Sequence, residues 1–201
     1  MKSLLSVLII LILSVLIGGG LALYSIKNIG DNASFMLYNG PWRVNPVMDL
    51  KNAKQRALIA KVGLFALRET EVIYFSAVKD SEGKTLNAKY DYLIEGSVPK
   101  SRYWSYTIYG EDDFLIPNED RLYGYNQKTI RYTQKDTLNP EFQNTAQRTY
   151  KMYMSQKPKK ENWLPAGNND KLTITLRLYN PSAEVYKNLL TVPLPSIKRV
   201  L

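Results

Sequence analysis

One long apolar run near the amino terminus restricts what this chain can fold into more than any other feature. Between Leu4 and Tyr24 there is no charged residue, and only Ser6, Ser14 and three glycines interrupt the hydrocarbon side chains. About 20 apolar residues, each rising about 1.5 Å along a helix, cross the ~30 Å hydrocarbon core of a bilayer. We therefore expect residues 4–24 to form one helix that contacts the lipid bilayer.

Two interpretations of this segment are open. Gly20 and Ala22 satisfy the small-x-small rule for signal peptide cleavage, whereas the length of the run favours a retained anchor. The sequence predicts that residues 1–24 are a transmembrane anchor, or an uncleaved signal sequence. Lys2 favours a cytoplasmic amino terminus, although Lys27 on the other side reduces the charge asymmetry. The expected topology is single-pass, with the rest of the chain extracytoplasmic.

The remaining residues are enough for one domain with a core of its own. Residues 25–48 are rich in Asn, Gly and Pro and indicate a linker that leads into the domain. From Asp49 onward, apolar residues recur at intervals of three and four, which predicts a helix at about 49–67. After Thr70 the pattern changes to short β-rich runs separated by turns, so the domain is expected to span residues 49–201.

Two of these runs alternate strictly between apolar and polar residues. "KLTITLRLY" places its apolar residues on one face, and "TYKMYMSQ" places Tyr150, Met152 and Met154 together. The apolar face of the first run consists of Leu172, Ile174, Leu176 and Leu178. The sequence therefore predicts a mainly β fold. We expect an antiparallel jelly-roll-like β-sandwich with one amino-terminal flanking helix, preceded by a single transmembrane helix.

Composition limits the chemistry that the domain can perform. Cysteine and histidine are both absent, which excludes disulfides, thiol nucleophiles, imidazole bases and the usual zinc or iron ligand sets. We accordingly expect no metal and no cofactor. The formal charge is +9, but the basic residues are scattered, with one small cluster at Lys157, Lys159 and Lys160. Scattered charge is typical of a solvated surface, so no nucleic acid partner is expected.

The stretch "RYWSYTIYG" has two different faces when it is read as a strand. Trp104 and Tyr106 belong to the larger, more apolar face, which we predict to be buried. Tyr103 and Tyr109 belong to the opposite face, which is either a shallow platform for a sugar or another planar ligand, or an ordinary strand surface. On the last long strand, Arg177 is expected to stack on or pair with a neighbouring Tyr or acid, or to serve an anionic ligand. The candidate ligand-binding residues are Tyr103, Tyr109, Arg177 and Tyr179.

Acidic residues follow the same stretch directly. Glu111, Asp112 and Asp113 come after Gly110, where the chain has to turn, and solvated acids in turns are commoner than catalytic ones. A glycosidase pair needs two carboxylates that face each other across a cleft, about 5 to 10 Å apart. The candidate catalytic residues on the enzyme hypothesis are Glu111, Asp112, Asp113, Glu119 and Asp120.

Five blocks in the chain resemble one bacterial family. In order, they are "YNGPWRVNP", "GLFALRETEVIYFSAVKDSEGKTL", "RYWSYTIYGEDDFLIPN", "RLYGYN" and "ENWLPAGNNDKLTITLRLYNP". They resemble the domain of unknown function 1214 (DUF1214) family over nearly everything from Asn39 to Pro181. The resemblance implies a jelly-roll-type sandwich, found alone behind one hydrophobic segment or as the second half of a longer protein. The companion half belongs to the domain of unknown function 1254 (DUF1254) family, which implies a separate protein of that type as a partner.

No activity can be carried over from this family, so two hypotheses remain. The favoured one is an extracytoplasmic domain tethered to the bacterial inner membrane, in the periplasm, that binds a partner protein or a glycan. The alternative is a carboxylate-dependent enzyme that acts on cell-envelope glycan. The enzyme requires two of the acidic side chains to converge in an aromatic-lined pocket.

Overall fold

The computed structural model describes residues 2–28, 36–44, 51–53, 56–57, 60, 71–133 and 148–200. The chain divides into two compact units. One unit consists of Met1–Ser34 and Met48–Ala66, and the other of Phe35–Val47 and Leu67–Leu201.

The first unit contains the long helix α1 (Lys2–Lys27), which confirms the continuous helix expected over residues 4–24. Its apolar span, Ser3–Ser25, has a mean hydropathy of 2.8 and none of it is buried inside the protein. The Ser14 hydroxyl donates a hydrogen bond to the Ile10 carbonyl at 2.8 Å. Because this polar group is satisfied within the helix, it does not oppose contact with lipid. By length and composition the helix can cross a membrane, and a signal sequence has the same properties.

The predicted helix at 49–67 is described only in part. Ala53, Arg56, Ala57 and Ala60 are helical, and the Arg56 amide donates to the Asn52 carbonyl at 3.1 Å. The other residues of this stretch lie outside the described residues, so its bounds remain a prediction.

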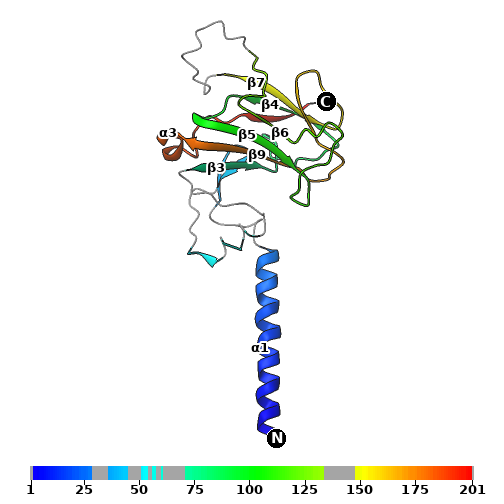
Figure 1. Cartoon of the computed structure of the whole chain (residues 1–201), viewed down its shortest axis with the longest axis vertical. Coiled ribbons are helices and arrows are strands. Elements are labelled where there is room, and N and C mark those ends of the chain that lie inside the picture. The colour runs from blue at the N-terminus through cyan, green and yellow to red at the C-terminus, as the bar shows by residue number, and fades with distance from the viewer. Residues whose placement is uncertain are drawn as a thin grey trace. The chain divides into compact units, whose positions relative to one another are not determined.

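The second unit is built from two β-sheets (Figure 1). The first has six strands in the order β1 (Leu37–Asn39), β2 (Trp42–Val44), β3 (Val72–Ala77), β9 (Thr173–Pro181), β5 (Ser101–Tyr109) and β6 (Gly124–Asn126). The second has four, in the order β10 (Ser196–Val200), β4 (Asp91–Gly96), β7 (Tyr150–Ser155) and β8 (Asn162–Pro165). A short helix, α3 (Ala183–Lys187), follows β9. The mainly β, two-sheet architecture is therefore as expected, while the jelly-roll connectivity remains a prediction.

One strand pair departs from the antiparallel arrangement that we expected. β7 and β8 are parallel, with Met152 opposite Asn162. The Asn162 amide donates to the carbonyls of Lys151 and Arg131, each at 2.7 Å, and its oxygen accepts from the Arg131 amide at 2.7 Å. This buried side chain therefore holds the first residue of β8 beside β7. Parallel neighbours usually need a connection of about a dozen residues or more, and residues 156–161 form a much shorter one.

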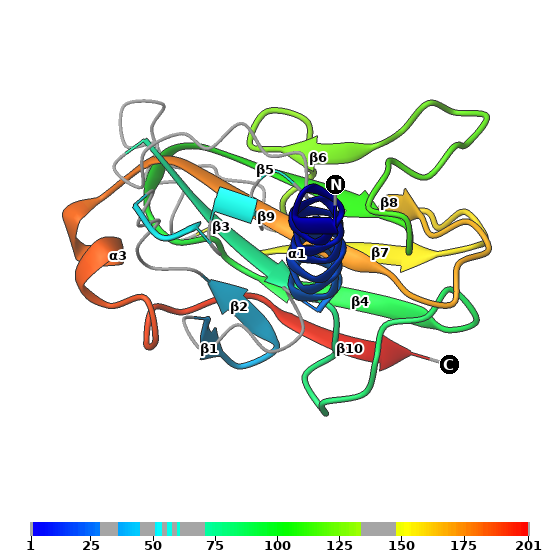
Figure 2. The ribbon, with the colours of Figure 1, turned by 90° about the horizontal axis from the view of Figure 1, so that it is seen from below.

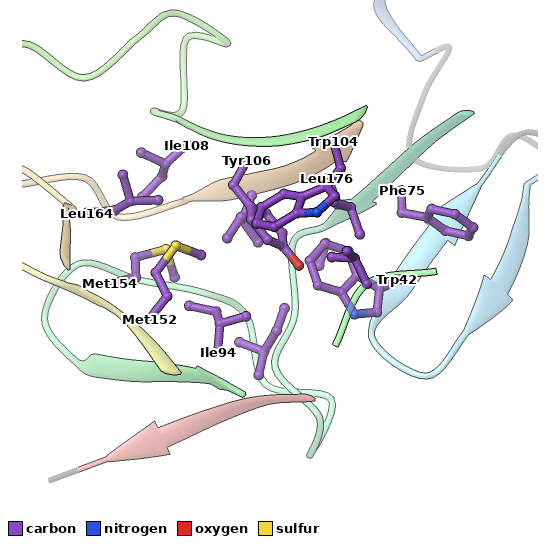
Figure 3. Close-up of a cluster of buried hydrophobic side chains, with 14 of the residues drawn as sticks. Trp42, Phe75, Ile94, Trp104, Tyr106, Ile108, Met152, Met154, Leu164 and Leu176 are labelled. Carbon is purple, nitrogen blue, oxygen red and sulfur yellow. The ribbon is translucent and has the colours of Figure 1, made fainter. Parts of the chain in front are cut away.

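The apolar faces predicted from the alternating runs meet in one core (Figure 3). The six-stranded sheet contributes Trp104, Tyr106 and Ile108 from β5, with Ile174, Leu176 and Leu178 from β9. The four-stranded sheet contributes Tyr150, Met152 and Met154 from β7. All of these residues, and Leu172 just before β9, are at most 1% exposed, which confirms the predicted faces.

Aromatic contacts join the two sheets. Tyr150 stacks on Trp104 with ring centroids 5.7 Å apart, and its hydroxyl lies 2.6 Å from that of Tyr106. Trp42, which is fully buried, lies 6.2 Å from the Tyr106 ring and donates from its indole nitrogen to the Pro195 carbonyl at 2.7 Å. Trp42 belongs to the stretch interpreted as a linker, so the sheet includes strands from that stretch. The sequence does not reveal β1 and β2 as strands, because three residues are too few to show a period of two.

Candidate functional site

The outer face of the six-stranded sheet carries the candidate site. Because side chains alternate across a strand, the residues between the core positions of β3, β9 and β5 all point away from the core. These three strands lie side by side in Figure 2, and both edges of β9 are paired. We use the term Tyr-Arg face for the outward residues of β1, β2, β3, β9 and β5. They are Tyr38, Arg43, Val72, Tyr74, Ser76, Tyr103, Ser105, Thr107, Tyr109, Thr173, Thr175, Arg177 and Tyr179, of which Val72 and Thr175 are buried.

Arg177 lies near the middle of this face, opposite Tyr74 on β3 and Ser105 on β5. Its Nη1 donates to the Thr107 hydroxyl at 2.8 Å, and its Nη2 donates to the Tyr109 hydroxyl. The guanidinium carbon lies 5.8 Å from the centre of the Tyr74 ring and 5.7 Å from that of Tyr109. Among the described residues, no carboxylate forms an ion pair with this side chain. The positive charge is therefore held by neutral hydroxyls and aromatic rings.

The ionisation of Tyr74 reflects the same surroundings. Burial is the largest influence and raises the pKa of the Tyr74 phenol above its ordinary value. The positive charge of Arg177 acts in the opposite direction but does not cancel it. The ring beside the guanidinium is thus partly removed from water, which strengthens its attraction for a cation.

A second arginine lies on this face, on β2. Arg43 is opposite Ser76, which in turn is opposite Thr175, so all three side chains lie on one side of the sheet. The Arg43 Nε is buried and has no hydrogen-bond partner among the described residues. Among the described residues, no carboxylate forms an ion pair with Arg43 either. The face therefore presents two guanidinium groups without a described carboxylate for either.

The rest of the face is aromatic on one side of Arg177 and rich in hydroxyls on the other. Tyr103 and Tyr179 are directly opposite each other, with ring centroids 5.7 Å apart and planes tilted by 47°. The hydroxyls of Ser76 and Thr175 are 2.9 Å apart, and Thr107 is the next residue in the same row. Along β9, the tyrosine pair is therefore followed by Arg177 and then by the row of hydroxyls, at the end of which Arg43 lies.

All four predicted ligand-binding residues, Tyr103, Tyr109, Arg177 and Tyr179, lie together on the Tyr-Arg face. Sequence reasoning missed Tyr74 and Arg43, because their place depends on which strands flank β9. The alternation in "VIYFSA" is a usable signal for Tyr74, since it opposes the buried Ile73 and Phe75. Arg43 is flanked by Trp42 and Val44, but its strand is too short for the pattern to be recognised.

The acidic candidates lie elsewhere, in the segment between β5 and β6. The Asp112 carboxylate accepts a hydrogen bond from the Phe114 amide at 3.0 Å, and Asp113 has a left-handed backbone with φ of 63°. These are properties of a tight turn. All five carboxylates, those of Glu111, Asp112, Asp113, Glu119 and Asp120, are exposed. Within the described ranges, no three acidic residues gather in a way that could hold a metal ion.

Comparisons with known proteins name a family and give one solved structure with a similar fold. The profile described as "Protein of unknown function (DUF1214)" matches residues 71–183. The crystal structure of the VPA0106 protein from Vibrio parahaemolyticus is similar over 74% of this chain and 35% of that one, with a TM-score of 0.56 and 24% sequence identity. A putative uncharacterized protein from Burkholderia cenocepacia covers 64% of this chain and 29% of its own, with a TM-score of 0.43 and 15% identity. No curated protein gives a significant match.

The chain spans about a third of the length of these solved structures. The family profile covers more than half of the chain, including β3, β9 and β5, the three strands that carry most of the Tyr-Arg face. The chain therefore belongs to the DUF1214 family of proteins of unknown function.

Proposed function

We propose that this protein is a membrane-tethered, extracytoplasmic binding module that holds an envelope partner on its Tyr-Arg face. One observation carries the proposal: Arg177 lies between the half-buried rings of Tyr74 and Tyr109 and has no described carboxylate partner, on a sheet whose inner face already forms the core. Charged groups withdrawn from water are normally paired. Guanidinium groups left with neutral neighbours therefore favour a ligand that brings the missing charge.

The tether in this proposal is α1. A helix of this length and hydropathy suits a single pass through the bacterial inner membrane, and Lys2 favours a cytoplasmic amino terminus. The domain would then lie in the periplasm. The proposed partners are a separate protein of the DUF1254 type and an envelope glycan. The greater length of the solved Vibrio relative supports a domain that works beside other polypeptide.

Site-specific photo-crosslinking in native membranes tests the proposal. A photoreactive amino acid replaces Tyr103 on the Tyr-Arg face or, as the control, Lys198 on β10 of the other sheet. Lys198 is exposed, and among the described residues its side chain forms one ion pair, with Glu95 at 4.0 Å. We expect an adduct from the Tyr103 position and none from the Lys198 position, and digestion with protease or glycosidase then identifies its class. Absence of any adduct at Tyr103, or equal adducts at both positions, contradicts the proposal.

A further inference from the structure

We propose that the Tyr-Arg face binds an acidic oligosaccharide, with its carboxylates on Arg43 and Arg177 and a sugar ring on Tyr103 and Tyr179. This inference rests on the proposed binding function and names the chemical class of the ligand.

Charge is the first argument. Nη1 and Nη2 of Arg177 each donate one hydrogen bond to a neutral hydroxyl, and no described carboxylate pairs with Arg177 or with Arg43, so both guanidiniums retain unused donors. A guanidinium presents its N–H groups as a planar fork that matches a carboxylate in two parallel hydrogen bonds. The same fork next to aromatic rings is shielded from water, which makes a charge-assisted hydrogen bond stronger there. An anionic ligand is therefore the chemistry that these two side chains fit.

Spacing is the second argument. Arg43 and Arg177 are on strands separated by β3, so their backbones are about 10 Å apart across the sheet at ~4.8 Å per strand. Along β9, the outward positions from Tyr179 to Thr173 extend over roughly 20 Å at ~3.3 Å per residue. A face of this size is larger than one sugar ring. It suits an oligomer that carries a negative charge at repeated positions.

The third argument separates a sugar from an acidic peptide. Peptides most often bind a sheet by adding a strand to a free edge, whereas β9 is paired on both sides and offers only side chains. Tyr103 and Tyr179 provide a half-buried aromatic surface for the C–H face of a ring. Ser76 and Thr107, on either side of the buried Thr175, provide hydroxyls that both donate and accept hydrogen bonds, as sugar hydroxyls require.

The test uses the full chain in detergent micelles and two matched probes. One probe is a hexamer of galacturonic acid, and the other is the same hexamer with every carboxylate methyl-esterified, which keeps the rings and removes the charge. We expect the acidic hexamer to bind wild type, with affinity that falls as salt is raised, and the ester to bind at least tenfold more weakly. Arg177→Gln and Tyr103→Ala should each weaken binding of the acidic hexamer at least fivefold. Lys198→Gln, which removes one positive charge from the other sheet, should change it less than twofold.

Thermal unfolding of each variant shows whether it is folded. If Arg177→Gln does not fold, Arg43→Gln is used in its place. Failure of the acidic hexamer to bind wild type, equal loss with Lys198→Gln, or equal binding of the ester overturns the inference. Stronger competition by inorganic polyphosphate, by an oligoglutamate peptide or by anionic lipid vesicles also overturns it. The two proposals fail separately: an adduct from the Tyr103 position without binding of the acidic hexamer leaves the binding function standing and removes the acidic sugar.

Discussion

Tyr106 and Tyr150 bring two phenol hydroxyls into the centre of the apolar core, where a single one would be costly. Each hydroxyl satisfies the other at 2.6 Å, and both rings are also in contact with Trp104. Because water is excluded, burial raises the pKa of both phenols well above the ordinary 10.0. The pair thus joins β5 to β7 as long as both groups stay protonated.

This pair predicts a loss of stability at alkaline pH. A pKa raised in the folded state means that the native protein holds these protons more tightly than the unfolded chain. Their contribution is fully present below pH 10.0, the unfolded value, and is lost as the pH rises above it toward the folded value. Urea unfolding between pH 8 and pH 11.5 measures this decline.

The control for that measurement is the double variant Tyr106→Phe with Tyr150→Phe. It removes both hydroxyls together, so that neither is left buried without the other, and it should lose less stability over the same pH range. Lysine titration is common to both proteins. Identical pH profiles for wild type and double variant would show that the pair does not control the alkaline loss.

Asp112 and Asp113 provide a residue-scale test of the enzyme hypothesis. Replacing both by Asn keeps the local hydrogen bond from the Phe114 amide and removes two solvated charges, so the fold should change little. We expect the double variant to complement a deletion of the gene at normal membrane abundance. A folded variant that fails to complement would instead support catalysis by these carboxylates. Glu111, Glu119 and Asp120 need the same test.

At the scale of single elements, β9 is the strand on which the six-stranded sheet depends. Ile174 is fully buried and lies opposite Ala77 on β3 and Ile108 on β5. Ile174→Asp places an unpaired charge among apolar contacts and should abolish cooperative unfolding. Thr173→Asp, one residue earlier on the outward face, should cost far less. Similar melting temperatures for the two variants would mean that the register of β9 is wrong, because a slip of one residue exchanges the faces.

The sequence predicts long strands better than it predicts their neighbours. β5, β7 and β9 alternate between chemically distinct faces, so their buried residues follow from period two alone. β1 and β2 have three residues each, fewer than the pattern needs. The parallel pairing of β8 depends on the Asn162 side chain, which has no periodic signal. Tyr103 and Arg177 lie on long alternating strands, so the sequence identifies them as candidates. Arg43 and Tyr74 lie beside them only because of the order of the strands in the sheet, which the sequence does not reveal.

At the scale of the whole molecule, the fate of α1 decides whether the domain stays attached to a membrane. If the helix is a retained anchor, the mature protein keeps its amino terminus and stays with the membrane after carbonate extraction, because the apolar span Ser3–Ser25 remains attached. Intact mass spectrometry of the purified native protein checks this. A mature amino terminus near Leu23, with a soluble protein, would identify the segment as a cleaved signal sequence.

The position of β9 between β3 and β5 also has a consequence for biosynthesis. The ribosome delivers β3 and β5 long before β9, yet neither can pair with the other, because the strand between them begins only at Thr173. An emerging chain therefore leaves one edge of β3 and one edge of β5 unpaired until residue 181 is free, and such late, non-local pairing is slow and prone to aggregation. We expect nascent chains arrested at residue 170 to be degraded by added protease, whereas released full-length chains resist it. The chain is therefore most exposed to proteases and to aggregation just before β9 leaves the ribosome, when β3 and β5 are made but cannot yet join in one sheet.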